Sequence, residues 1–302
     1  DGAGDTMRKI VIALVLLAAG ALALAVGWVL SAPVMPQIVL ASYNSDLANG
    51  RTMFLIGGCS SCHAVPKQDD ATRLGGGLAL PTAFGTFHVP NISPDAKDGI
   101  GRWSEAQFIA AMRYGISPSS EHLYPAFPYT SYHAMRTEDL RDLFAYLKTL
   151  PAVSGAVSDH ELTFPFSIRR TVGLWKLLFF DDAQFKADPA QSPQWNRGAY
   201  LVNGPGHCAE CHSPRNLLGA VIASRRFTGG EVPTGQGGVP NITQEKLRDW
   251  KVEDYVEVLD SGMTPDADRI GGPMVEVVAN TRQLSAADRE AIAVYLKSLR
   301  AK

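Results

Sequence analysis

Two short motifs in this sequence combine thiols with imidazole at the same spacing. Residues 59–63 are CSSCH and residues 208–212 are CAECH, so each motif sets two cysteines three positions apart, with a histidine directly after the second. Thiols at this spacing reach the two vinyl groups of one porphyrin, and the following histidine supplies an axial nitrogen to its iron. The sequence therefore predicts two covalently attached haem c groups. The predicted attachment residues are Cys59, Cys62, Cys208 and Cys211, and the predicted iron ligands are His63 and His212.

Other uses of such cysteine pairs fit this chain less well. A zinc site needs two pairs close in the chain or a histidine pair at metal spacing, yet 145 residues separate Cys62 from Cys208. A thioredoxin-like redox pair follows a strand in a βαβ unit and gives no reason for a histidine after each pair. Haem attachment at both motifs is therefore preferred, and it consumes all four cysteines of the sequence.

The similarity between the two halves extends beyond the motifs, which indicates an internal repeat. Trp103, Gly115 and Pro118 recur in the second half at a common offset of 147 residues, and YLKTL at residues 146–150 recurs as YLKSL at residues 295–299. These end segments show helical periodicity, and no alternation typical of strands is sustained. The sequence therefore predicts an all-α, loop-rich architecture of two homologous haem domains, in which haem replaces much of the core.

One apolar run lies ahead of the first motif. Ile10–Leu30 contains no charged residue, and a helix of this length rises about 31 Å, which matches the hydrocarbon core of a bilayer. Arg8 and Lys9 precede the run, so the N-terminus is expected in the cytoplasm and the rest outside. A cleaved signal peptide is the alternative, because Ala21–Ala23 resembles a cleavage site, although the run exceeds the usual core of about 7–15 residues. We expect a single-pass protein of the bacterial inner membrane with both haem domains in the periplasm.

These patterns divide the chain into six segments. They are a cytoplasmic N-terminus at 1–9, a transmembrane anchor at 10–30, a linker at 31–46, a first haem domain at 47–150, a connecting segment at 151–195 and a second haem domain at 196–302. Within the first segment, Asp1–Thr6 is a cloning scar or an alternative start. The connecting segment is too apolar for a flexible linker and too interrupted to span a membrane. It is either a helix buried between the haem units or an interfacial helix with Trp175 at the lipid boundary.

The composition excludes several classes of protein. Among 302 residues, 46% are apolar and 19% charged, and 28 Lys and Arg stand against 30 Asp and Glu. The net charge of −2 argues against a nucleic-acid-binding protein, which would carry a basic excess. The sequence contains no dinucleotide fingerprint, serine elbow or metal cluster apart from the haem motifs, so substrate oxidation is assigned to a partner.

Three further stretches carry a family resemblance: WNRGAYL at 195–201, SPRN at 213–216 and LYPAFPY at 123–129. Together with the second motif they resemble the cytochrome c subunits of membrane-bound bacterial dehydrogenases. That family serves quinoprotein alcohol dehydrogenases, flavin-dependent gluconate and fructose dehydrogenases, and molybdenum hydroxylases. The resemblance covers nearly all of the chain after the anchor, although family members often have three haem domains and this chain has two.

The resemblance implies class I cytochrome c-like domains that transfer electrons. The expected partner is a catalytic dehydrogenase subunit carrying flavin, pyrroloquinoline quinone or molybdopterin, and the expected electron acceptor is quinone or a terminal oxidase. The chain itself shows no substrate-oxidising site. Two alternatives stay open: a c-type cytochrome subunit of a haem–copper oxidase, and a haem peroxidase or gas sensor with an open first haem.

The resemblance also implies Met274 as the sixth iron ligand of the second haem, with Met263 as its local rival. The offset of 147 residues carries Met274 onto Phe127, whose side chain cannot ligate iron. For the first haem the sequence leaves three outcomes: bis-histidine ligation, a distant methionine, or five-coordinate iron. The candidate ligands are His88, His122, His133 and Met135.

Overall fold

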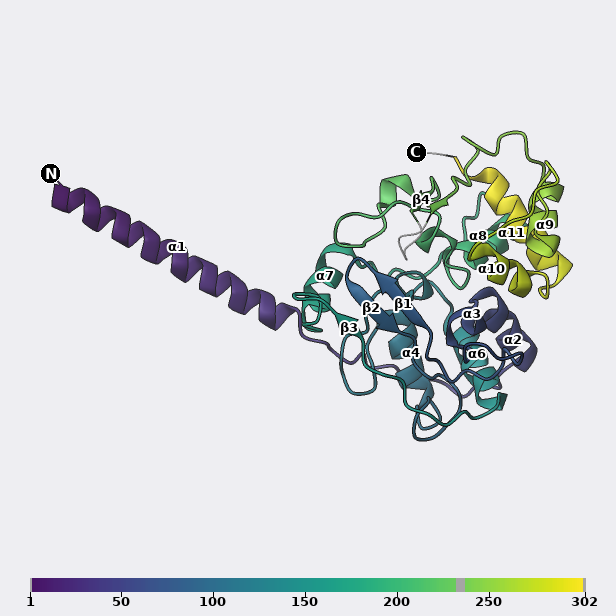
Figure 1. Ribbon diagram of the computed structural model, residues 1–302, viewed down its shortest axis with the longest axis horizontal. Helices are drawn as coiled ribbons and strands as arrows, with labels where there is room; N and C mark the ends of the chain where they lie inside the picture. The colour runs from purple at the N-terminus through teal and green to yellow at the C-terminus, as the bar shows by residue number, and fades with distance from the viewer. Residues whose placement is uncertain (1, 232–236, 301–302) are drawn as a thin grey trace.

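The computed structural model describes residues 2–231 and 237–300. Residue 1 and residues 301–302, at the ends of the first and last predicted segments, lie outside the described residues, as do residues 232–236. Helix α1 (Gly2–Leu30) projects from a body that holds all other elements (Figure 1). It is the one helix among the described residues that is long and apolar enough to cross a membrane.

The first half of the body contains α2 (Leu47–Ile56), α3 (Cys59–His63), α4 (Glu105–Tyr114), α5 (Tyr129–Tyr132) and α6 (Thr137–Thr149). Local chemistry fixes where these helices begin and end. The Asp46 carboxylate accepts hydrogen bonds from the first backbone amides of α2, and Ser104 forms a capping box with Gln107 at the start of α4. Gly115 ends α4 in the left-handed conformation, with φ of 56°, which favours glycine.

The second half contains α8 (Pro193–Asn203), the 3-10 turns η1 (Cys208–Glu210) and η2 (Ala223–Arg225), α9 (Val252–Ser261), α10 (Met274–Thr281) and α11 (Ala286–Ser298). Similar caps occur here, and Gly262 stands where the repeat places Gly115. Ser285 caps α11 by accepting from the Asp288 amide, and Gly262 ends α9 in the left-handed conformation, with φ of 77°.

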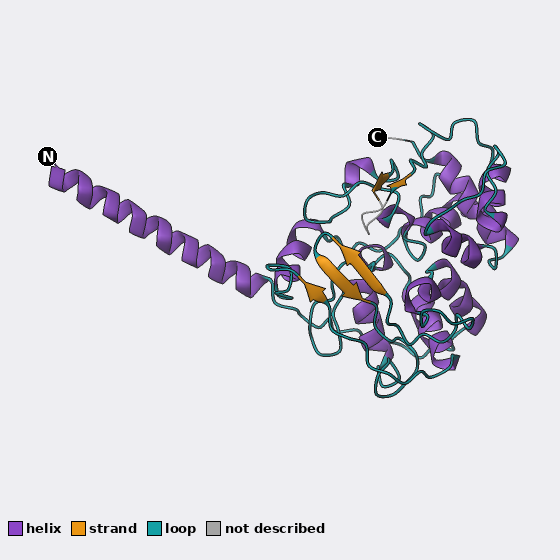
Figure 2. Ribbon diagram, in the orientation of Figure 1, coloured by secondary structure: helices purple, strands orange, loops and turns teal. Residues whose placement is uncertain are grey.

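Two small antiparallel sheets accompany the helices (Figure 2). The first has the order β1 (Ala79–Thr82), β2 (Gly85–His88), β3 (Glu161–Leu162), and the second pairs β4 (Gly230–Glu231) with β5 (Gly238–Val239). These strands have two to four residues, too few to produce a recognisable alternation in the sequence. The prediction of an all-α fold is confirmed for the body of the protein, with these short sheets as an addition.

A glycine permits close helix crossing in each half. Gly50 lets α2 pack on α6, because a Cβ there would overlap the backbone carbonyl oxygen of Asp142. Gly198 does the same for α8 on α11, where a Cβ would overlap the carbonyl oxygen of Ala291. The buried apolar side chains of both helix pairs belong to one continuous core. The repeat seen in the sequence is therefore also a repeat of packing.

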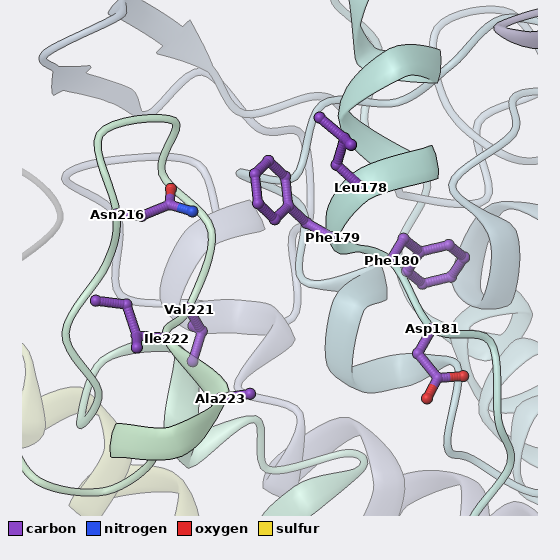
Figure 3. Close-up of a pocket in the computed structure, with 8 residues that line it drawn as sticks. All are labelled: Leu178, Phe179, Phe180, Asp181, Asn216, Val221, Ile222 and Ala223. Atoms are coloured by element: carbon purple, nitrogen blue, oxygen red, sulfur yellow. The ribbon is translucent and has the colours of Figure 1, made fainter.

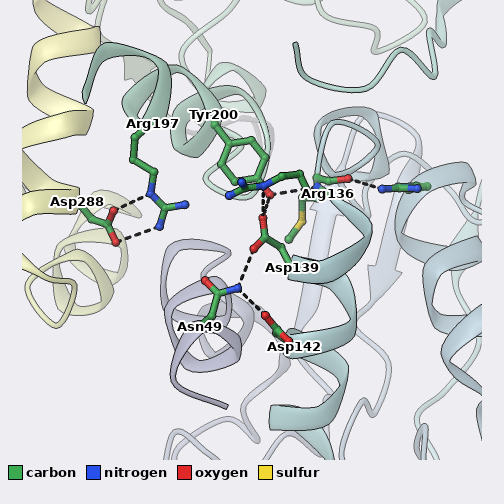
Figure 4. A network of polar contacts seen from close by, with 9 residues as sticks. Asn49, Arg136, Asp139, Asp142, Arg197, Tyr200 and Asp288 are labelled. Carbon is green, nitrogen blue, oxygen red and sulfur yellow. Dashed lines mark hydrogen bonds and ion pairs between the residues drawn. The ribbon is translucent and has the colours of Figure 1, made fainter. Parts of the chain in front are cut away.

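Polar groups join the two halves beside this core (Figure 4). The Tyr200 hydroxyl on α8 donates to the Asp139 carboxylate on α6 and accepts from the Arg136 amide at 3.2 Å. The Asn49 side-chain amide donates to a carboxylate oxygen of Asp139 at 2.7 Å and to one of Asp142 at 2.7 Å. These two carboxylates are buried, so each needs the partners that the network supplies.

The connecting segment forms helix α7 (Thr171–Phe179) at the junction between α1 and the body (Figure 1). Val172 and Gly173 are buried, whereas Leu177 and Leu178 are exposed. Lys176 holds the helix in place, since its ammonium group donates to the carbonyl oxygens of Tyr114 and Gly115 at the end of α4. This helix therefore packs on the first half with one side and leaves the other side open.

Candidate haem-binding sites

The first motif forms helix α3, directly after α2. Gly58 precedes Cys59 in the left-handed conformation, with φ of 57°, and turns the chain from α2 into the motif. The His63 ring places Nδ1 2.8 Å from the carbonyl oxygen of Pro90. A carbonyl oxygen can only accept, so Nδ1 carries the proton and Nε2 keeps its lone pair. This leaves His63 in the tautomer that an iron ligand needs.

The second motif repeats this arrangement in a tighter turn. Cys208 begins η1. The His212 ring, at the end of the motif, places Nδ1 2.9 Å from the carbonyl oxygen of Pro240. Pro90 and Pro240 both open the sequence Pro-Asn-Ile, so the same loop orients both histidines. Burial lowers the pKa of His63 to about 4 and lowers that of His212 as well. Both rings are therefore neutral at pH 7, as ligation of iron requires.

The four motif thiols lack the lowered pKa of a redox-active cysteine pair. Burial raises the pKa of Cys59 and of Cys208 to about 12, with a smaller contribution from the second cysteine of each motif. Redox-active cysteine pairs instead have a lowered pKa that stabilises the thiolate. No disulfide joins the four cysteines, and among the described residues no cluster of three His, Cys, Asp or Glu could hold a metal ion alone. This donor set fits an iron that arrives within a porphyrin.

The two motif segments lie in contact with each other. His207, directly before Cys208, places Nε2 3.2 Å from the carbonyl oxygen of Gly57, two residues before Cys59. The Tyr132 hydroxyl donates to the same carbonyl at 3.1 Å, and its ring meets the His207 ring edge-on with centroids 5.6 Å apart. The structure therefore brings together two motifs that 144 residues separate in the chain.

Each half also forms hydrogen bonds to the haem motif of the other half. The Glu210 carboxylate, inside the second motif, accepts from the hydroxyls of Thr130 at 2.7 Å and Ser131 at 2.9 Å, both on α5. In the reverse direction, the Asn280 side chain on α10 donates to the Ser61 hydroxyl of the first motif at 2.9 Å. The contacts run both ways between equivalent elements, so the halves meet at their haem motifs.

Glu210 stays ionised within this contact. Although burial raises the pKa of Glu210, the Arg215 guanidinium at 2.8 Å and the two hydroxyls outweigh that effect and hold it below its ordinary value. Neither Glu210 nor His207 stood out in the sequence analysis. Their positions inside and directly beside the second motif were the available signal, but their partners lie about 80 and 150 residues away in the chain.

The repeat also aligns the loops that follow α4 and α9. Ile116 bridges His122 in the first half, and Met263 bridges Arg269 in the second. The Leu123 backbone amide donates to the carbonyl oxygen of Gly115 at 2.8 Å, as the Ile270 backbone amide donates to the carbonyl oxygen of Gly262 at 2.8 Å. All these pairs keep the offset of 147 residues. Phe127 just ahead of α5 thus corresponds to Met274 at the start of α10.

Comparisons with known proteins agree with this geometry. The family model for cytochrome c matches residues 47–151. A protein of Cereibacter sphaeroides described as "Diheme cytochrome c-type" is 47% identical over 289 residues, which cover 95% of both chains. The present chain belongs to the dihaem c-type cytochromes. The prediction of two covalently attached haem c groups is confirmed.

Two further relatives are subunits of dehydrogenases. A nicotinate dehydrogenase subunit of Pseudomonas putida is 40% identical over 284 residues, which cover 93% of this cytochrome and 24% of that protein. The fructose dehydrogenase cytochrome subunit of Gluconobacter japonicus is 35% identical over 268 residues, which cover 87% of this cytochrome and 54% of that protein. This cytochrome therefore spans about a quarter of the first of these relatives and about half of the second. The family resemblance inferred from the sequence is confirmed.

The candidates for the sixth ligands occupy different environments. Met274 is exposed to a greater extent than the core methionine Met135, which is fully buried. The ring of Phe127 is half-buried and lies 5.6 Å from that of Tyr132. The remaining candidates contact other groups: His122 places Nε2 2.8 Å from the Ser31 carbonyl oxygen, His88 places Nε2 3.2 Å from Glu161, and His133 meets the Phe180 ring edge-on. The sixth ligands of both haems stay predictions.

The aligned loops allow a direct test of the Phe127 position. In the variant Phe127→Met, we expect the midpoint potential of the first haem to rise on the order of 100 mV, because a thioether ligand favours ferrous iron. Redox titration and the methionine-to-iron charge-transfer band measure the change. Phe127→Leu is the control, with an apolar side chain that cannot ligate. Equal potentials in the two variants would show that Phe127 does not occupy the ligand position.

Proposed function

We propose that this cytochrome is the membrane-anchored electron-transfer subunit of a periplasmic dehydrogenase. Each haem c, when bound, supplies one-electron cycling between ferric and ferrous iron. The observation that carries the proposal is the contact between the motif segments through His207 and Gly57. Cofactors attached to touching segments are close enough to exchange electrons without a moving carrier, which suits a relay between a donor and an acceptor.

The chain's own residues hold the two cofactors in a fixed relation, as we propose, within haem domains at residues 47–150 and 196–302. The four motif cysteines would attach the porphyrins, His63 and His212 would ligate the irons through Nε2, and Met274 would supply the sixth ligand of the second haem. Pro90 and Pro240 fix the imidazole orientations through their carbonyl oxygens. Because these supports are backbone groups of folded loops, little needs to rearrange when the irons change oxidation state.

The relatives support a dehydrogenase as the electron donor. Their names include nicotinate, fructose, alcohol and gluconate dehydrogenases, so we propose a catalytic partner carrying molybdopterin, flavin or pyrroloquinoline quinone. Electrons then pass to quinone or to a terminal oxidase. We propose that quinone, if it is the acceptor, binds in the open pocket between the end of α7 and residues 216–223 (Figure 3). Its walls include Leu178, Phe179, Val221 and Ile222, which suit an apolar ring.

We propose further that α1 is a retained anchor in the bacterial inner membrane, with the haem domains in the periplasm. The helix is apolar and uncharged over Ile10–Leu30, and none of its described residues is buried in the body. Contacts hold the end of α1 on the body: the His122 ring binds the Ser31 carbonyl oxygen, and Arg170 donates to the Trp28 carbonyl oxygen at 2.6 Å. The apolar run exceeds the usual core of a signal peptide, which favours retention over cleavage.

Purification from membranes tests the proposed function. We expect the tagged full-length chain, solubilised in mild detergent, to bring down a dehydrogenase subunit whose substrate reduces both haems. The matched control is the variant lacking Cys208 and Cys211, in which the same substrate should reduce only one haem. Recovery of a haem–copper oxidase core without any dehydrogenase, or substantial peroxide turnover by the chain alone, would contradict the proposal.

A further inference from the structure

Helix α7 presents an apolar side that nothing in the described chain covers. Leu174, Leu177 and Leu178 follow the spacing of one helical face, and their side chains are 42%, 59% and 71% exposed. The opposite side is fixed, because Val172 and Gly173 are buried and Lys176 donates to the end of α4. The leucines therefore cannot be buried by rotating the helix on the body.

Neighbouring loops extend this side into a larger surface. The Trp175 indole nitrogen donates to the Leu218 carbonyl oxygen at 2.9 Å, which brings the loop 214–222 beside α7. Leu217 is 97% exposed and Leu218 is 48% exposed. We name the surface formed by the three leucines of α7 together with Leu217 and Leu218 the α7 face. Large apolar side chains grouped in this way mark an interaction site.

The α7 face is continuous with the end of α1. A Cβ at Gly27 would lie 3.6 Å from the Leu174 side chain, and Gly173 approaches Ser31 so closely that a Cβ would overlap its carbonyl oxygen. The Arg170 guanidinium lies over the Trp28 ring, 5.0 Å from its centroid. Figure 1 shows α7 at the point where α1 enters the body. The exposed apolar surface of α1 thus adjoins the α7 face near Leu174.

We propose that the α7 face lies in the boundary between the headgroups and acyl chains of the bilayer that α1 crosses. An amphipathic helix with leucines on one side and basic residues nearby binds a bilayer in this way, and Arg169 and Arg170 directly precede α7. The inference rests on the proposed membrane anchoring by α1. Two attachments, one spanning and one interfacial, fix how the haem motifs are oriented above the membrane. They also place Leu178 and Phe179 of the pocket in Figure 3 at the lipid boundary.

Photo-crosslinking to lipid tests this surface directly. The full-length chain is reconstituted in nanodiscs that contain a diazirine phosphatidylcholine, and adducts are mapped by mass spectrometry. We expect peptides 171–180 and 214–222 to carry about tenfold more lipid adduct than the reference peptide 245–260, since an interfacial face sits ~5–10 Å deep. If α1 carries lipid adducts but the peptides of the α7 face are labelled only as much as the reference peptide, this inference is overturned and the anchoring proposal stands. Absence of adducts on α1 would overturn the anchoring proposal and this inference with it.

A variant pair separates docking from general labelling. In the double variant Leu177→Glu/Leu178→Glu, we expect the lipid adducts on 214–222 to fall about tenfold, because the charges lift the whole face, while those on α1 stay unchanged. The control is Leu47→Glu, which changes a 48% exposed leucine at the start of α2, a helix that Figure 1 shows on the far side of the body from α1. It should change neither signal. Undiminished adducts on 214–222 in a double variant with full haem content would contradict the inference.

Discussion

Replacing Cys208 and Cys211 together by alanine should halve the covalent haem content, from two groups per chain to one. The variant keeps His212 and its bond to Pro240, but an axial nitrogen alone does not hold haem through denaturation, whereas thioether bonds do. The Cys59→Ala/Cys62→Ala variant should lose the other haem. Intact-mass spectrometry under denaturing conditions gives the haem count of each variant.

The control for this prediction is Ser60→Ala, which lies within the first motif and leaves its two thiols and histidine intact. It should keep both haems. Loss of both groups from either double variant, with the chain still present at normal levels, would show that the motifs are not independent attachment sites. Retention of both groups would show that the thiols are not the attachment points.

The variant Gly198→Ala should destabilise the second half strongly. The added Cβ would overlap the Ala291 carbonyl oxygen and approach Tyr295 Cβ to 2.9 Å, so α8 and α11 must move apart. Overpacking of this kind costs about 3 kcal/mol of unfolding free energy. Urea denaturation followed by the haem absorbance of the second half measures the loss.

The matched control is Gly238→Ala, because Gly238 is exposed and, among the residues that the structure describes, a Cβ there comes no nearer than 3.9 Å to another atom. We expect its unfolding free energy to change by less than about 0.5 kcal/mol. Gly50→Ala should reproduce the Gly198 effect in the first half, where the Asp142 carbonyl oxygen takes the place of Ala291. Equal stabilities of the Gly198 and Gly238 variants would contradict the close helix crossing.

Much of the site could be predicted from the sequence because haem attachment is local chemistry. Two thiols and an imidazole within five residues define each motif, and no distant contact is needed to recognise them. The helix caps at Ser104 and Ser285 are equally local. The offset of 147 residues, read from Trp103 and Gly115, also holds in the bonds that lead to Phe127 and Met274.

The remaining features depend on contacts between distant residues. His207 meets Gly57 across 150 residues, and Asn280 meets Ser61 across 219, so no local pattern could reveal that the motifs touch. The β1–β2 hairpin is too short to show alternation. For the connecting segment, apolar content alone left both burial and lipid contact open, and the contacts of Gly173 and Trp175 were needed to define an exposed side.

The most direct test of the account is a spectroelectrochemical titration of the full-length chain. We expect two one-electron steps per chain at different potentials, and Met274→Ala should lower only the higher step, which belongs to the second haem. Two such steps would establish the paired one-electron centres that a relay requires. A single one-electron step, or two steps whose potentials are both unchanged in Met274→Ala, would contradict the proposed pair of haems with Met274 as a ligand.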